Sequence, residues 1–169
     1  MRDNWVIKFI PLVVIWGSSF FLIELSLELT TAVGVAFWRT ALGALAMIII
    51  TYSLGLRLPS EAKQWLHLLV AGFFMSAFPF TMYAFAQQYT TSILAAILNA
   101  TTPMFTLLAT FTLFRAQKQN PTAIIGLLVG LVGVGITLGI WQGFGASEPI
   151  AILALIATSM SFGIGTPYI

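Results

Sequence analysis

The sequence predicts an all-α protein, a polytopic bundle of six transmembrane helices with a cytoplasmic N-terminus. The first observation is composition: 59% of the 169 residues are hydrophobic and 7% are charged, with a mean hydropathy of +1.00. Soluble domains carry about 25% charged residues, and a soluble chain of this size buries only about 70% of its unfolded surface. Lipid must therefore solvate much of this chain. The other two observations are the lengths of its apolar stretches and the positions of its basic residues.

Each apolar stretch is about 20 residues long, the length that crosses the hydrocarbon core of a bilayer. The predicted spans are residues 5–27, 32–54, 65–87, 91–114, 121–141 and 149–169. The breaks between them read ELTT, GLRLPSEAKQ, QYTT, RAQKQN and GFGASE. The first span is not predicted to be a cleaved signal peptide, because its apolar stretch is too long and no small-residue cleavage site precedes a soluble domain.

Basic residues predict the orientation, since Lys and Arg are retained on the cytoplasmic side. Six of the seven fall on one side of the predicted topology: Arg2, Lys8, Arg57, Lys63, Arg115 and Lys118. The opposite side carries only Glu28 and Glu148. We therefore expect the N-terminus in the cytoplasm. The net charge of +2 is too small to predict a nucleic-acid partner.

The seventh basic residue, Arg39, lies inside the second span, about 12 Å below its outer end at a rise of about 1.5 Å per residue. A charge at that depth costs several kcal/mol if it faces lipid. Its helical face also carries Ala36, Gly43 and Ala46, which suit close helix packing. We therefore expect Arg39 to face protein, with Glu24 of the first span as its partner in a structural ion pair. A snorkelling anchor and a direct substrate contact are the alternatives.

Polar residues recur at helical spacing in the third and fourth spans. The third carries Gly72, Ser76, Pro79, Tyr83 and Gln87, and the fourth carries Ser92, Asn99, Thr102, Thr106 and Thr110. A single hydroxyl is better explained as an interhelical hydrogen bond worth about 0.6 kcal/mol, but two such stripes together favour a polar cavity. The candidate substrate-binding residues are Trp16, Ser18, Arg39, Tyr83, Gln87, Asn99 and Thr102.

Two prolines interrupt these spans near mid-membrane and are predicted to kink their helices. Pro79 and Pro103 each free the carbonyl four residues back, which belongs to Met75 and to Asn99 respectively. Irregular backbone is tolerated in a membrane where it is buried in protein or lines water. The kinks therefore support the predicted cavity.

The fifth span is rich in glycine and has almost no polar side chains, so it is predicted to be a packing helix. No catalytic or metal-binding pattern is visible: His67 is the only histidine, cysteine is absent, and no phosphate-binding loop occurs. A lone histidine is more often structural than catalytic. We expect no enzyme activity, no metal and no cofactor.

Four landmarks occur in order: IWGSSF (15–20), FWRTALGAL (37–45), TTSILAAILNATTPMFTLLAT (90–110) and GLLVGLVGVGI (126–136). They resemble the EamA-type members of the drug/metabolite transporter superfamily over about residues 5–140. The resemblance implies a ten-helix secondary transporter in the cell membrane (in bacteria, the inner membrane). Two five-helix repeats of opposite topology would surround a central cavity, and alternating access would export small metabolites or amino-acid-like solutes. An odd number of spans also requires a repeated unit to insert inverted.

On this resemblance, residues 1–141 form the first repeat, and residues 149–169 form a sixth helix that begins a second, missing repeat. The family commonly has an acidic residue after the fourth helix, and Gln117 in FRAQKQNP falls near that place here. We therefore do not expect any salt bridge or cytoplasmic gate that such an acid makes. Since the chain ends at GTPYI, we expect a fragment or a half-length variant.

Two alternatives remain open at the level of sequence. One is a non-transporting membrane scaffold whose glycine-rich helix docks a partner, and the other is a half-size transporter that acts as an antiparallel dimer. The six-to-none bias of basic residues argues against insertion in both directions. The expected partners are the lipid bilayer, a small-molecule solute, and either a second repeat or a second copy of the chain. Few fixed charges in the pathway favour zwitterionic or neutral amphipathic solutes.

Overall fold

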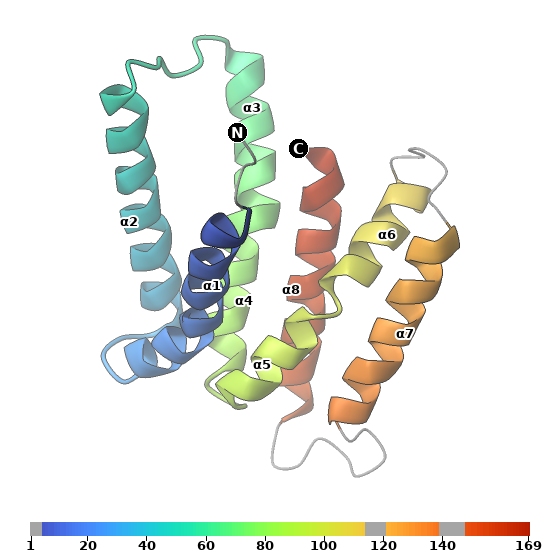
Figure 1. The fold of residues 1–169 in the computed structure, drawn as a ribbon. Helices are drawn as coiled ribbons and strands as arrows, with labels where there is room; N and C mark the ends of the chain where they lie inside the picture. The colour runs from blue at the N-terminus through green and yellow to red at the C-terminus, as the bar shows by residue number, and fades with distance from the viewer. Residues whose placement is uncertain (1–4, 114–120, 139–147) are drawn as a thin grey trace.

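A computed structural model of the chain describes residues 5–113, 121–138 and 148–169. Every element in these ranges is helical: α1 Trp5–Leu27, α2 Ala32–Ser53, α3 Ala62–Gly72, the π-helical turn η1 Phe73–Ala77, α4 Phe78–Ala86, α5 Ser92–Asn99, α6 Thr102–Thr112, α7 Pro121–Leu138 and α8 Pro149–Tyr168. Helices α3, η1 and α4 run on as one long span, and α5 and α6 form another span that is interrupted in the middle (Figure 1).

Five stretches are long and apolar enough to cross a membrane: Phe9–Leu27, Ala32–Ser53, Ala62–Ala86, Ser92–Thr112 and Pro149–Tyr168. They coincide with five of the six predicted spans. The remaining prediction falls on α7, which has 18 residues and whose apolar part, Ile124–Ile136, is a shorter stretch. The predicted fold class, a polytopic bundle of apolar helices, is therefore confirmed.

Short polar sequences explain where the helices begin and end. The side chain of Thr31 accepts a hydrogen bond from the backbone N–H of Gly34 at 3.2 Å and caps α2. Thr91 caps α5 in the same way, accepting from the N–H of Leu94 at 3.3 Å. Threonine is a favourable residue at this position because its oxygen pairs one of the free N–H groups of the first turn. Gly55, with φ +70°, follows the end of α2, where a left-handed residue commonly stops a helix.

Successive spans run in opposite directions, as the predicted topology requires (Figure 1). The connection from α2 to α3, the end of α6 and the end of α8 lie at one end of the bundle. The turn from α1 to α2, the connection from α4 to α5 and the start of α8 lie at the other.

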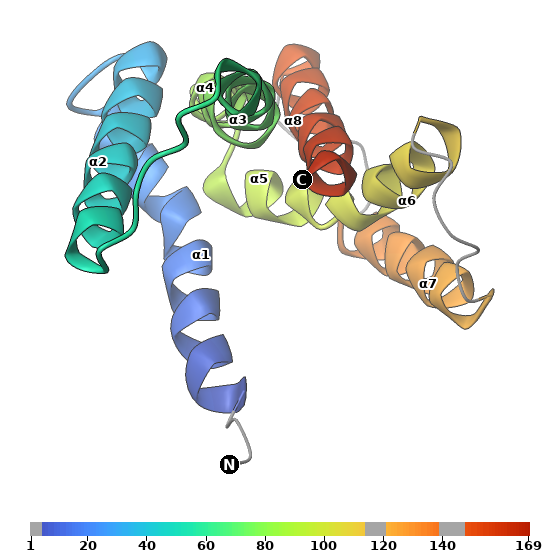
Figure 2. The same ribbon diagram turned by 90° about the horizontal axis from the view of Figure 1, so that it is seen from above.

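Helix α8 lies at the centre of the packing and contacts α4, α5, α6 and η1. Half of this span is buried, a larger share than in any other span described. Viewed from above, α8 stands between α3–α4 and α6 (Figure 2). A Cβ atom on its Gly163 would lie 2.6 Å from the backbone carbonyl carbon of Phe105 in α6. The sixth span therefore packs into the same core as the spans before it.

Candidate functional site

The span formed by α3, η1 and α4 and the span formed by α5 and α6 are both irregular near their middles; we call them the two central spans. The π-helical turn η1 joins α3 to α4 just before Pro79, and the break between α5 and α6 falls just before Pro103. In the π register the N–H of Phe78 bonds the carbonyl of Phe73, five residues back. The carbonyl that Pro79 would have paired in this register belongs to Phe74, whereas the expected α-helical register assigned it to Met75.

Serines of α8 bond the backbone carbonyls at both irregular places. The hydroxyl of Ser161 donates to the carbonyl of Phe74 at 2.9 Å, and the hydroxyl of Ser159 donates to the carbonyl of Leu98 at 3.1 Å. Hydroxyls on a neighbouring helix are a general means of pairing backbone groups freed by a proline in a membrane, and this explains the contact at Phe74. The carbonyl of Leu98 also accepts from the backbone N–H of Thr101 at 3.0 Å, so Ser159 adds a further bond there. The sequence does not reveal that these serines bond the two irregular turns. The polar residues of the third and fourth spans give no indication of partners about 60 to 90 positions later in the chain.

Three predicted site residues meet at the break between α5 and α6. The hydroxyl of Tyr83 donates to Oδ1 of Asn99 at 2.5 Å, and the hydroxyl of Thr102 donates to the same oxygen at 3.2 Å. Tyr83 is only 3% exposed and packs edge-on against Phe20 of α1, with ring centres 5.2 Å apart. Both bonds end on Oδ1, and the amide N–H donors of Asn99 have no hydrogen-bond partner in the part of the chain described here.

Gln87, one helical turn after Tyr83, is buried with no hydrogen bond to either polar atom of its side chain within the described residues. Leaving a buried amide unpaired costs about 1–3 kcal/mol, so such a group in a native fold needs an explanation. Phe80, Tyr83 and Gln87 share one face of their helix, since they are separated by three and four residues.

Other members of the stripes bond within their own helix. Thr106 donates to the carbonyl of Thr102 at 3.0 Å, and Thr110 donates to the carbonyl of Thr106 at 2.7 Å. These hydroxyls line the same face of α6, but their protons are used by the backbone four residues back. The stripe pattern thus marks a polar helix face, and only part of it joins the cluster of Tyr83, Asn99 and Thr102.

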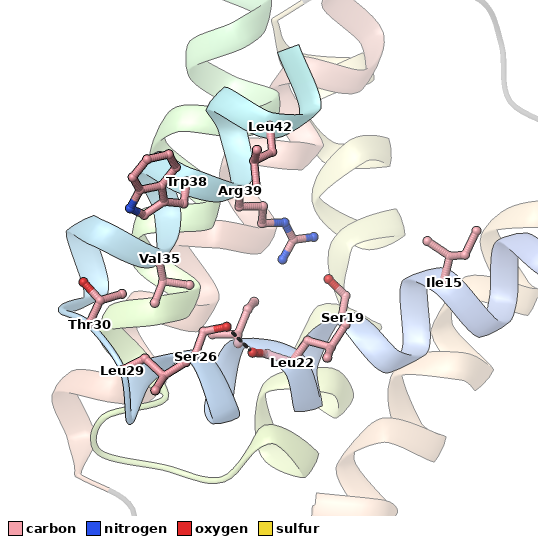
Figure 3. A pocket seen from close by; sticks show the side chains of 11 residues that line it. Ile15, Ser19, Leu22, Ser26, Leu29, Thr30, Val35, Trp38, Arg39 and Leu42 are labelled. Atoms are coloured by element: carbon pink, nitrogen blue, oxygen red, sulfur yellow. Dashed lines mark hydrogen bonds between the residues drawn. The ribbon is translucent and has the colours of Figure 1, made fainter. Parts of the chain in front are cut away.

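Arg39 points from α2 into a cavity of about 780 Å³ between α1 and α2 (Figure 3). Its guanidinium carbon lies 4.1 Å from the centre of the Phe80 ring in α4. A cation over an aromatic face is attracted by about 0.5–2 kcal/mol, which offsets part of the cost of placing the charge within the membrane. Tyr83 lies one turn after Phe80 on the same face of α4. The arginine therefore borders the polar cluster.

The structure does not bring Glu24 to Arg39. The α1 residues that line the cavity include Ile15, Ser19, Leu22 and Ser26, which recur every three or four positions. Glu24 falls on a different helical face and is exposed. No ion pair joins the two residues among those described, and the observed partner of the arginine is the Phe80 ring. The depth of Arg39 in its span and the small residues on its helical face predicted that it faces protein. They could not identify its partner, an aromatic ring 41 residues later in the sequence.

Two predicted site residues on α1 lie apart from the cluster. The Trp16 side chain is 47% exposed, and its ring centre is 6.4 Å from that of Phe162 in α8. Ser18 is exposed and donates to the carbonyl of Ile15 at 3.2 Å. Its neighbour Ser19 is the serine of this pair that lines the cavity with Arg39 (Figure 3).

Two further observations concern residues singled out by the sequence. Nδ1 of His67 lies 2.6 Å from the hydroxyl of Tyr168, and this contact links the middle of α3 to the end of α8. In α7, a Cβ atom added to Gly126 or Gly130 would meet nothing within 4 Å. The packing partner expected for this glycine face is therefore not among the described residues. Within the same residues, no group of three or more His, Cys, Asp or Glu side chains could hold a metal ion.

Comparisons with known proteins agree with these features. The model of the EamA-like transporter family matches residues 4–139. An uncharacterized transporter of Archaeoglobus fulgidus is 31% identical over 121 residues, which make up 71% of this chain and 40% of that relative. The matched part of the chain thus spans less than half the length of this curated relative. No solved structure matches the chain.

Proposed function

Because this chain belongs to the EamA-like transporter family, we propose that it is half of a secondary transporter that exports small metabolites or amino-acid-like solutes by alternating access. A second five-helix unit, from further chain or from a second copy of this one, would complete the solute pathway. The assembly would be a multi-pass protein of the cell membrane, in bacteria the inner membrane, with its N-terminus in the cytoplasm. The observation that carries the proposal is the polar cluster of Tyr83, Asn99 and Thr102 at an interrupted membrane helix.

Interrupted helices are where secondary transporters commonly hold their solutes, near the middle of the membrane. Here the interruption places the Asn99 side chain at the end of α5 and Thr102 at the start of α6. Two hydroxyls orient the Asn99 amide by donating to its oxygen, so its N–H groups can donate to a carbonyl or carboxylate of the solute. Gln87 supplies a second amide without a partner among the described residues.

Alternating access requires an element that can bend, and the two irregular turns provide one in each central span. Ser161 of α8 donates to the carbonyl of Phe74 at the first turn, and Ser159 of α8 donates to the carbonyl of Leu98 at the second. A shift of α8 would therefore change its hydrogen bonds to both irregular turns at the same time. We assign the cluster to solute binding and the contacts of α8 to the coupling between binding and movement.

The test is efflux from proteoliposomes that contain the complete transporter and are loaded with a labelled mixture of neutral amino acids. Asn99→Ala should lower the efflux rate by more than it lowers the amount of folded protein, because it removes the amide but little packing volume. Thr112→Ala is the control, since Thr112 is exposed at the end of α6 and donates only to the carbonyl of Leu108. Equal losses of efflux and folded protein in Asn99→Ala would assign the cluster to helix packing instead.

A further inference from the structure

The described residues that line the cavity between α1 and α2 include one cation, Arg39, and no anion. Its walls are mainly apolar, with Leu22 on α1 and Val35 and Leu42 on α2. Within this setting the guanidinium of Arg39 points toward the hydroxyl of Ser19 (Figure 3). Neither group has a hydrogen-bond partner in the described ranges. The hydroxyl of Ser26, in contrast, donates to the carbonyl of Leu22 at 2.7 Å.

Within the described part of the chain, no carboxylate is placed to neutralise this cation. The acids on α1 and in its following turn, Glu24 and Glu28, are exposed and do not line the cavity. The guanidinium carbon lies 4.1 Å from the centre of the Phe80 ring. An aromatic ring has no lone pair to accept a hydrogen bond, so this contact leaves the N–H donors of the guanidinium without an acceptor. Those donors form a fork that matches two oxygens of a carboxylate or phosphate.

We propose that this cavity binds the carboxylate or phosphate of an amphipathic anion, with Arg39 as the main donor and Ser19 as the second. The apolar body of the ligand lies against Leu22, Val35 and Leu42. The ligand comes either from solution, as the transported solute, or from the bilayer, as an anionic lipid headgroup. In the first case the inference rests on the proposed function and narrows its substrate class to solutes with an anionic group and an apolar side.

The primary measurement is binding of N-acetyl-L-leucine and of N-acetyl-L-leucinamide to the full chain in neutral detergent. These probes differ only in the anionic group. The acid should bind at least about tenfold more tightly than the amide, because a hydrogen bond to a charged group is worth at least that ratio. In Arg39→Gln the ratio should fall to about one, while Arg57→Gln, an exposed arginine outside the cavity, should keep the wild-type ratio.

A second variant covers the case in which Arg39→Gln does not fold. Ser19→Ala keeps the charge, and it should weaken binding of the acid by about two- to tenfold with little change for the amide. Equal affinity of the wild-type chain for the acid and the amide would overturn an anionic solute site while leaving transport of neutral solutes intact. Failure of efflux together with acid binding that depends on Arg39 would remove the proposed transport and keep the site.

The lipid source has its own arm. The thermal midpoint is measured in nanodiscs of phosphatidylcholine with and without phosphatidylglycerol, for the wild-type chain and for Arg39→Gln. If phosphatidylglycerol raises the thermal midpoint of the wild-type chain but not that of Arg39→Gln, and the soluble acid does not bind, the cavity is assigned to a lipid phosphate. Binding of the soluble acid without that rise assigns it to a solute. If neither measurement shows a response that depends on Arg39 or Ser19, the proposal is overturned.

Discussion

The hydroxyl of Ser161 in α8 donates to the backbone carbonyl of Phe74, 2.9 Å away, inside the π-helical turn between α3 and α4. This carbonyl lies five residues before Pro79, which has no N–H to offer it. The π-helical turn thus leaves one acceptor unpaired by its own helix, and a side chain that follows 87 positions later in the sequence occupies it. The irregular turn and α8 are therefore expected to depend on each other.

Ser161→Ala should destabilise the bundle by about 0.6–1.7 kcal/mol, the range of interhelical hydrogen bonds in membrane proteins. The thermal midpoint in detergent measures this. Ser53→Ala is the matched control, since Ser53 is exposed at the end of α2 and donates to the carbonyl of Ile50 in its own helix. An equal effect of the two variants would mean that the contact of Ser161 does not hold α8 in place.

Gly163→Ala should be more damaging, because its Cβ would lie 2.6 Å from the carbonyl carbon of Phe105 and 2.8 Å from the nitrogen of Thr106. Both are backbone atoms, so the helices must separate, at a cost of about 1–3 kcal/mol. Gly130→Ala in α7 adds a methyl group where nothing lies within 4 Å, and it should be neutral or stabilising through helix propensity. The two variants are compared by thermal unfolding, and a neutral Gly163→Ala would contradict the close packing of α6 and α8.

The course of the helices was predictable from the sequence because hydropathy and turn chemistry act over short distances. Thr31 and Thr91 begin the helices that follow them, and the apolar stretches have the length of the membrane. The two prolines likewise lie in the first turns of α4 and α6. These features depend on residues within one helix or on its immediate flanks.

The partners within the site were much less predictable, because they depend on how helices rotate against each other. Arg39 meets Phe80 rather than Glu24, and Ser19 rather than Ser18 lines the cavity. A rotation of one residue, about 100°, separates such alternatives, and hydropathy barely changes over that angle in a helix that is apolar all round. The contact of Tyr83 with Asn99 was more predictable, since both residues lie on polar stripes of neighbouring spans.

The orientation of the chain can be measured with single cysteines, because the natural sequence has none. We expect a membrane-impermeant thiol reagent applied from outside to label Leu29→Cys and to spare Ser60→Cys. Both positions are exposed, in the turn from α1 to α2 and in the connection from α2 to α3, which lie at opposite ends of the bundle (Figure 1). The reverse pattern would place the N-terminus outside.

Tyr83→Phe should reduce transport severalfold with a loss of stability near 0.6 kcal/mol. The ring and its packing against Phe20 remain, but Asn99 keeps only Thr102 as a donor to its oxygen, so the amide loses its fixed orientation. Efflux and thermal unfolding are measured on the same preparation. Phe85→Leu, in the same helix, serves as a control for altered aromatic packing, and a transport loss no larger than that of this control would contradict the role of the hydroxyl.

The last prediction concerns the contact between Arg39 and Phe80. If the ring compensates for the charge within the membrane, the effects of Arg39→Gln and Phe80→Leu on unfolding should couple by about 0.5–2 kcal/mol, because either change alone already removes the contact. A parallel cycle with Arg39→Gln and Glu24→Gln should be additive within about 0.5 kcal/mol, since Glu24 is exposed on another face of α1. Both cycles are measured by unfolding in neutral detergent. Coupling to Glu24 with additivity at Phe80 would restore the ion pair expected from the sequence, and it would remove the free cation on which the anion site depends.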